Sequence, residues 1–140
     1  MPTLFHENRL TFYWGYFILG KDGDLLMNRE EKYKLQLLKK IQKILKQSQV
    51  KFKIEQEYYF FSGKKRNYVD FVIIVRSRII PIEVKHDESE WTKKECRAQI
   101  ARYNRHFKQN KKANRTILMS PKGRYGISET ELLNQIEACA

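Results

Sequence analysis

Two strongly apolar runs separated by a short basic break constrain this chain more than any other stretch. Residues 68–75 read Tyr-Val-Asp-Phe-Val-Ile-Ile-Val, and residues 79–85 read Ile-Ile-Pro-Ile-Glu-Val-Lys after an Arg-Ser-Arg break. Such runs are rich in β-branched side chains, and a short polar segment joins them. The pattern predicts a β-hairpin at the centre of the fold.

Three ionisable residues interrupt these apolar runs. Successive side chains of a strand point to opposite faces, so Asp70 shares a face with Val72 and Ile74. By the same rule Glu83 and Lys85 share a face of the second strand. An isolated charge is costly to bury, so each of the three needs a partner or a function. Two carboxylates at the ends of adjacent strands can hold a hard divalent cation, and a neighbouring ammonium can orient or deprotonate a water.

Asp70 followed by Glu83-Val84-Lys85 resembles the motif of the PD-(D/E)XK nuclease superfamily, although Val69 replaces the proline of that motif. The resemblance implies an α/β, restriction-endonuclease-like core over roughly residues 28–120, with a mixed β-sheet flanked by helices in the order αβββαβ. It also implies that Asp70 and Glu83 bind Mg²⁺, for which Mn²⁺ can substitute, and that Lys85 positions or activates the attacking water. The competing interpretation is a charged hairpin edge with a surface Glu/Lys pair.

A first helix is predicted from residue 28 to about residue 47. Asn28 suits the N-cap, and Glu31 at the third helical position can complete a capping box. Apolar residues follow at helical spacing, at positions 35, 38, 41 and 45. In the resembled superfamily a glutamate of the first helix often adds a metal ligand. Glu31 is the first candidate for that ligand and Glu30 the second, with capping as the equally good alternative for Glu31.

A second helix is predicted from about residue 90 to Phe107, and it carries Gln99 and Tyr103. Residues spaced i, i+4 are neighbours on a helix surface. This pair, placed after Glu-x-Lys, resembles the Gln-x-x-x-Tyr motif of RecB-like nucleases and of type I restriction enzymes. The resemblance implies that both side chains lie by the active site and help to orient the substrate. The alternative is a solvent-facing glutamine and a core tyrosine.

The net charge of +12 predicts a polyanionic partner. The simplest partner is DNA, with RNA as a possibility, and no membrane partner is expected. The expected phosphate contacts, which position a strand without reading its sequence, are Lys64, Lys65, Arg66, Lys94, Arg97, Arg105, Lys111 and Lys112. No secretion signal or membrane-length apolar run is recognisable, and the two cysteines lack metal-type spacing, so a cytoplasmic location is expected.

The whole chain is predicted to be a single nuclease-like domain. Residues 1–27 would form an N-terminal extension that could fold as a hairpin. Its aromatic run favours core packing or a homodimer contact over stacking on bases. Residues 28–120 would form the core, and residues 121–140 would contain a last helix capped by Ser128. The strand near residues 116–120 follows a crossover helix, so it should join the sheet in parallel.

The favoured function is a metal-dependent deoxyribonuclease that hydrolyses phosphodiester bonds in DNA. Three alternatives stay open at this point. One is a dimeric Holliday-junction resolvase of the same fold, which would require a homodimer. Another is a non-catalytic, basic nucleic-acid-binding protein in which the carboxylates are structural. The third is an RNA nuclease, because the chemistry is the same and only contacts to the 2′-hydroxyl would differ.

Overall fold

The computed structural model describes residues 28–86 and 92–140. The expected N-terminal hairpin therefore lies outside the described residues. The elements follow in the order α3 (Arg29–Gln47), β1 (Phe52–Ser62), β2 (Lys65–Val75), β3 (Arg78–Val84), α4 (Lys93–Phe107), β4 (Ile117–Met119) and α5 (Glu129–Cys139). The predicted order of one helix, three strands, a helix, a strand and a last helix is confirmed.

The four strands form one mixed sheet in the order β1-β2-β3-β4. β1, β2 and β3 are joined as antiparallel hairpins, whereas β4 runs parallel to β3 with Glu83 opposite Leu118. α4 makes the crossover that a parallel pair requires. The predicted α/β class and the parallel last strand are both confirmed, and the arrangement agrees with a restriction-endonuclease-like core.

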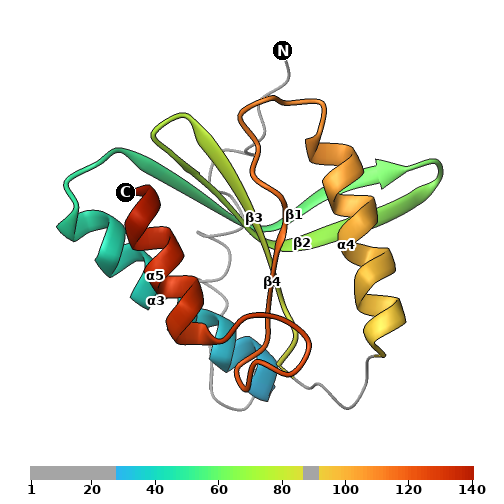
Figure 1. Ribbon diagram of the computed structural model, residues 1–140, viewed down its shortest axis with the longest axis horizontal. Coiled ribbons are helices and arrows are strands. Elements are labelled where there is room, and N and C mark those ends of the chain that lie inside the picture. Colours follow the sequence, from blue (N-terminus) through green and yellow to red (C-terminus); the bar gives the residue numbers. More distant parts are fainter. Residues whose placement is uncertain (1–27, 87–91) are drawn as a thin grey trace, which may run out of the picture.

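Helices cover both faces of the sheet: α3 and α5 pack side by side on one face, and α4 packs on the other (Figure 1). The α3/α5 face buries a large apolar cluster, which includes Leu37, Ile41, Phe71, Ile73, Ile82 and Ile136. The α4 face buries a smaller cluster, made by Tyr58, Phe60, Val69, Val72, Ile79, Tyr103 and Phe107. The predicted alternation of β2 is confirmed for residues 71–75, because Phe71 and Val72 lie in different clusters. It breaks at Asp70, which was predicted to share a face with Val72 but contacts Lys34 of α3 on the opposite face.

Side-chain caps fix where the helices begin. The Oδ1 atom of Asn28 accepts the Glu31 N–H at 2.8 Å, so the predicted N-cap of α3 is confirmed. α4 begins at Lys93, later than the predicted start near residue 90, because Thr92 and Glu95 form a full capping box. On α3 the buried stripe includes Leu37, which is fully buried, while Leu35 of the predicted stripe is only half-buried.

The long β1–β2 hairpin changes face in its middle. Ile54 packs in the α3/α5 cluster, whereas Tyr58, four residues further along the same strand, packs in the α4 cluster. Between them Glu57 has a left-handed backbone with φ +51°, and the ladder is interrupted there, between the pairs Gln56↔Phe71 and Tyr58↔Val69. A non-glycine residue with positive φ in a strand is uncommon and marks a local kink. The kink turns the outer half of the hairpin towards α4.

No helix in the described ranges is both long enough and apolar enough to span a bilayer.

Candidate active site

The candidate site lies where β2 and β3 separate. The two strands are paired only as far as Phe71↔Ile82, and Asp70 follows at the point of separation. Its Oδ2 atom accepts the Val84 N–H at 2.7 Å, which is a bond from the main chain of β3 to a side chain of β2. The Asp70 N–H in turn donates to Glu83 Oε1 at 3.3 Å. These two bonds fix both carboxylates at the fork between the strands.

Glu83 and Lys85 lie together on the α4 face of β3. The Lys85 Nζ donates to Glu83 Oε2 at 3.1 Å. The side chain of Lys85 is 4% exposed and that of Glu83 is 7% exposed. The Lys85 N–H donates to the Met119 carbonyl of the neighbouring strand region at 2.8 Å. The structure therefore brings Asp70, Glu83 and Lys85 together, as the sequence motif indicates.

A fourth charged residue, Lys34 of α3, belongs to this site and was missed by the sequence analysis. Its Nζ lies 2.5 Å from Asp70 Oδ1 and 3.3 Å from Glu30 Oε1. Burial lowers the pKa of Lys34, but the charge and hydrogen bond of Asp70 outweigh this, and the pKa lies above its ordinary value. A sequence signal exists, since Lys34 follows Glu31 by three residues and lies on the same side of the helix.

The Glu83 carboxyl is held in an environment that disfavours its charge. Burial raises its pKa, the nearby Asp70 carboxylate raises it further, and Lys85 and Lys34 oppose the shift without cancelling it. Two carboxylates that repel each other at a buried fork gain from any additional positive charge near them. The donor set, two carboxylates on neighbouring strands, has the chemistry that Mg²⁺ prefers.

Glu31 does not form a three-carboxylate group with Asp70 and Glu83. It lines a small recess together with Lys34, Glu57 and Asp70, and its N–H is held by the Asn28 cap. Across residues 28–86 and 92–140 there is no group of three His, Cys, Asp or Glu side chains that could hold a metal ion. The residues nonetheless fit Mg²⁺, which is commonly bound by one or two carboxylates and keeps several of its waters.

Tyr103 and Gln99 face this site from α4. Tyr103 is 1% exposed, and its hydroxyl donates to the main-chain carbonyl of Tyr68, two residues before Asp70. Burial raises the Tyr103 pKa, as do the charges of Glu83 and Asp70, while a hydrogen bond from Gln99 opposes the shift. Tyr103 therefore anchors β2 beside the carboxylates, and its burial keeps its hydroxyl away from solvent.

The Oε1 atom of Gln99 is a buried acceptor that has no hydrogen-bond partner among the described residues. A buried polar atom without a partner costs about 1–3 kcal/mol, and such atoms in native proteins commonly bond to a water or an ion. Because Gln99 and Tyr103 share one face of α4, this acceptor faces the same side as the carboxylates. It fits a hydrated cation, whose waters are hydrogen-bond donors.

The predicted phosphate-binding cations are all exposed, and they fall into three groups. The tip of the β1–β2 hairpin carries one group, the exposed surface of α4 the second, and the loop after α4 the third. In that order they are Lys64, Lys65 and Arg66, then Lys94, Arg97 and Arg105, then Lys111 and Lys112. At the tip, Arg66 lies over the rings of Tyr59 and Phe61, at 5.0 and 5.1 Å from the ring centres.

An aspartate at the fork of two strands, beside a Glu-x-Lys strand and within this mixed sheet, defines a PD-(D/E)XK-like nuclease domain. The chain belongs to the NERD family, the nuclease-related domain, which matches residues 28–128. That range contains the whole sheet together with α3 and α4. No curated protein and no solved structure matches the chain significantly.

Proposed function

We propose that this chain is a metal-dependent deoxyribonuclease that hydrolyses phosphodiester bonds in DNA. One observation carries the proposal: Asp70, Glu83 and Lys85 are linked by hydrogen bonds at the fork between β2 and β3. Charged side chains are rarely buried in a sheet unless they are paired or functional. Here two carboxylates repel each other at the same place, which is a costly arrangement for a purely structural role.

Asp70 and Glu83 are the residues that would hold Mg²⁺ in this proposal. When bound, the ion would lower the pKa of a water and offset the charge that develops on the phosphate. The oxygens that would serve it are Asp70 Oδ1, which Lys34 now contacts, and the Glu83 carboxylate, which Lys85 contacts. Mn²⁺, which takes similar oxygen ligands, is expected to substitute.

Lys85 is the residue proposed to position the attacking water. Its ammonium is held by Glu83 on the α4 face of the sheet, so its donors are directed into the site rather than out to solvent. Gln99 supplies an acceptor on the facing helix, and a water between them would be oriented from two sides. Tyr103 acts indirectly, by fixing the strand that carries Asp70.

The exposed cations support a nucleic acid as the substrate. The net charge of +12 attracts a polyanion, and the hairpin tip combines three cations with the exposed aromatic rings of Phe61 and Tyr68, which are 56% and 49% exposed. Cations contact phosphates, and aromatic rings stack on unpaired bases. This pairing of side chains suits a strand with accessible bases.

The test is cleavage of labelled single-stranded, linear duplex, supercoiled and four-way-junction DNA, and of RNA, with Mg²⁺, with Mn²⁺ and with EDTA. We expect metal-dependent cleavage by the parent and a loss of about 100-fold or more in Glu83→Gln and in Lys85→Met, because general acid–base and electrostatic groups commonly contribute that much. Preference for the junction by a dimer would assign a resolvase, and cleavage of RNA alone would assign an RNA nuclease.

The matched controls are Glu129→Gln and Lys40→Met. These two residues form another Lys/Glu pair, with Nζ 2.9 Å from Oε1, between α3 and α5 and away from the fork. Both controls should cleave like the parent. Binding without cleavage of any substrate under either metal would contradict the proposal and leave a nucleic-acid-binding protein. Cleavage that survives in Glu83→Gln and Lys85→Met would show that the site is wrong.

A further inference from the structure

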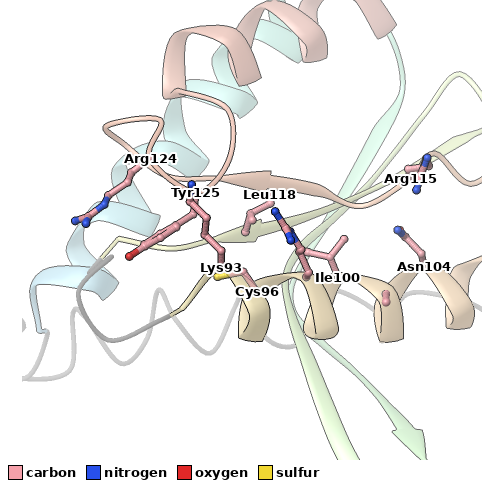
Figure 2. Close-up of a pocket in the computed structure, with 10 residues that line it drawn as sticks. Lys93, Cys96, Ile100, Asn104, Arg115, Leu118, Arg124 and Tyr125 are labelled. Atoms are coloured by element: carbon pink, nitrogen blue, oxygen red, sulfur yellow. The ribbon is translucent and has the colours of Figure 1, made fainter.

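A pocket of about 470 Å³ lies between α4, β4 and the loop that follows β4. Figure 2 shows it as an elongated trough, with Arg124 and Tyr125 at one end and Arg115 and Asn104 at the other. A second hollow, of about 390 Å³, shares Asn104 and Arg115 with it and continues towards Lys108 at the end of α4. Volumes of this size are typical of sites that take small organic ligands.

The rim of the pocket is strongly basic. Lys93 and Arg97 come from α4, Arg115 from the segment before β4, and Arg124 from the loop after it, while none of the described residues that line the pocket is acidic. Within the described part of the chain none of these four cations forms an ion pair, in contrast to Lys34 and Lys40 of α3. Arginine guanidinium groups match the geometry of a phosphate and can bind it through two hydrogen bonds.

The floor of the pocket is apolar. Ile100 of α4 faces Leu118 of β4, and the ring of Tyr125 closes one end beside Lys93 (Figure 2). Ala101 also lines the pocket. A bare anion gains little from such a floor, since its contacts are made by the cations alone. A base or a sugar would bury apolar surface there, and an aromatic ring adds a surface for stacking. The lining therefore suits a phosphate that carries an organic group.

The floor also adjoins the candidate active site. Leu118 lies directly opposite Glu83 in the parallel β3–β4 ladder, and neighbouring strands are about 4.8 Å apart. Paired residues of a ladder point to the same face, so both side chains lie on the α4 side. Cys96, which lines the pocket and is 1% exposed, belongs to α4, the helix that covers the face of β3 on which Glu83 and Lys85 lie.

We propose that this pocket binds a nucleoside phosphate, namely one unit of the substrate strand beside the bond that is cut. The cationic rim holds the phosphate, and the floor at Ile100, Leu118 and Tyr125 holds the base or the sugar. The trough that continues towards Lys108 then gives the strand a path along α4. The role in cleavage rests on the proposed function, whereas the binding itself does not require cleavage.

The experiment measures the binding of fluorescein-labelled single-stranded dodecathymidylate in EDTA, where no cleavage occurs. The pocket variant is Arg115→Gln with Arg124→Gln, and the control is Lys39→Gln with Lys43→Gln, two exposed lysines of α3. We expect about tenfold weaker binding in the pocket variant and less than a twofold change in the control. The slope of log K against log salt should become shallower by about 1.4, since each phosphate contact contributes about 0.7 for a single strand.

A second arm asks whether the ligand includes the nucleoside. Thymidine 5′-monophosphate, thymidine and inorganic phosphate compete with the labelled strand at constant ionic strength. The proposal predicts that the monophosphate competes at tenfold or more lower concentration than either of the others, and that Tyr125→Ser removes this advantage. Calorimetry of the monophosphate alone, with the parent and the pocket variant, distinguishes a free nucleotide site from a site for a strand.

Inorganic phosphate that competes as well as the monophosphate would overturn the assignment of a nucleoside. Equal binding of the strand by the parent, pocket and control proteins would overturn the pocket itself. Glu83→Gln separates this inference from the proposed function, because it should bind the strand normally in EDTA while failing to cleave it with Mg²⁺. If the parent cleaves DNA but the pocket variant binds and cleaves equally well, only the pocket inference fails.

Discussion

Replacing Lys34 with methionine tests how the candidate site is charged. The Lys34 Nζ contacts Asp70 Oδ1 at 2.5 Å, and the two side chains are only 21% and 12% exposed. Methionine keeps a long apolar stem on α3 and removes the ammonium group. In the proposed function, a divalent cation that uses Asp70 would have to displace this ammonium from Oδ1, so Lys34 would compete with the metal. We therefore expect Lys34→Met to bind Mn²⁺ more tightly than the parent.

The size of the effect follows from the contact that the metal must break. A hydrogen bond to a charged group contributes about 1.5–3 kcal/mol net. Each 1.4 kcal/mol is roughly tenfold in affinity, so the gain should be about 10- to 100-fold. Without metal the variant should be less stable, by about 3 kcal/mol, because Asp70 is left at a largely buried position without its cation. Saturating Mn²⁺ should recover most of that loss.

The assay is calorimetric titration of metal-free protein with Mn²⁺, supported by urea unfolding with and without the metal. The control is Lys40→Met on the same helix, whose partner Glu129 lies 2.9 Å away in a more exposed pair. This control should bind Mn²⁺ like the parent, since exposed pairs contribute little. Equal or weaker Mn²⁺ binding by Lys34→Met would refute the reasoning and indicate that Lys34 supports the metal-bound state.

Three further predictions concern the supports of the site. Tyr103→Phe should lower the free energy of unfolding in urea by about 1–3 kcal/mol, because it leaves a main-chain carbonyl of β2 without its donor. Burial lowers the pKa of His106 below its usual 6.5. As the pH decreases, the unfolded chain therefore protonates this imidazole before the folded chain does, and the free energy of unfolding should fall below about pH 6.5. In His106→Gln this fall should be smaller. Gly126→Ala should lower the melting temperature strongly, since the new Cβ would lie 2.1 Å from the Leu118 carbonyl oxygen. The control is Gly63→Ala, whose Cβ meets no atom within 4 Å. It should lower the free energy of unfolding by only about 1–2 kcal/mol, through its left-handed backbone. A normal melting temperature for Gly126→Ala would contradict the packing of this loop.

The order of the elements could be predicted from the sequence because each one carries a local signal. The alternation of apolar residues in β2 and β3 indicates which side chains share a face. Asn28 and Ser128 are N-cap residues, and they indicate where α3 and α5 begin. The convergence of Asp70 with Glu83 was implied by the motif, since Asp70 lies where β2 separates from β3 and Glu83 lies near the end of β3. These features depend on periods of two or 3.6 residues, which a single sequence displays.

Features that depend on contacts between distant elements were not predictable in this way. Lys34 and Asp70 are 36 residues apart, and only the packing of α3 on the sheet brings them together. The kink at Glu57 has no local glycine to indicate it. The basic pocket combines Arg97 with Arg124, which belong to different layers of the fold. The motif also suggested Glu31 as a ligand, and the capping signal at the same residue gave no means of choosing between the two roles.

The kink at Glu57 explains why a polar centre can exist inside so apolar a sheet. On one side of it the hairpin contributes to the cluster under α3 and α5, and on the other side to the cluster under α4. Asp70 stands opposite the kink, at the seam where one apolar interior ends and the other begins. Apolar side chains are therefore buried in a cluster on each side of Asp70, and the boundary between the two clusters stays polar. In this chain the same kink that divides the interior into two apolar clusters also marks the place where its charged residues gather.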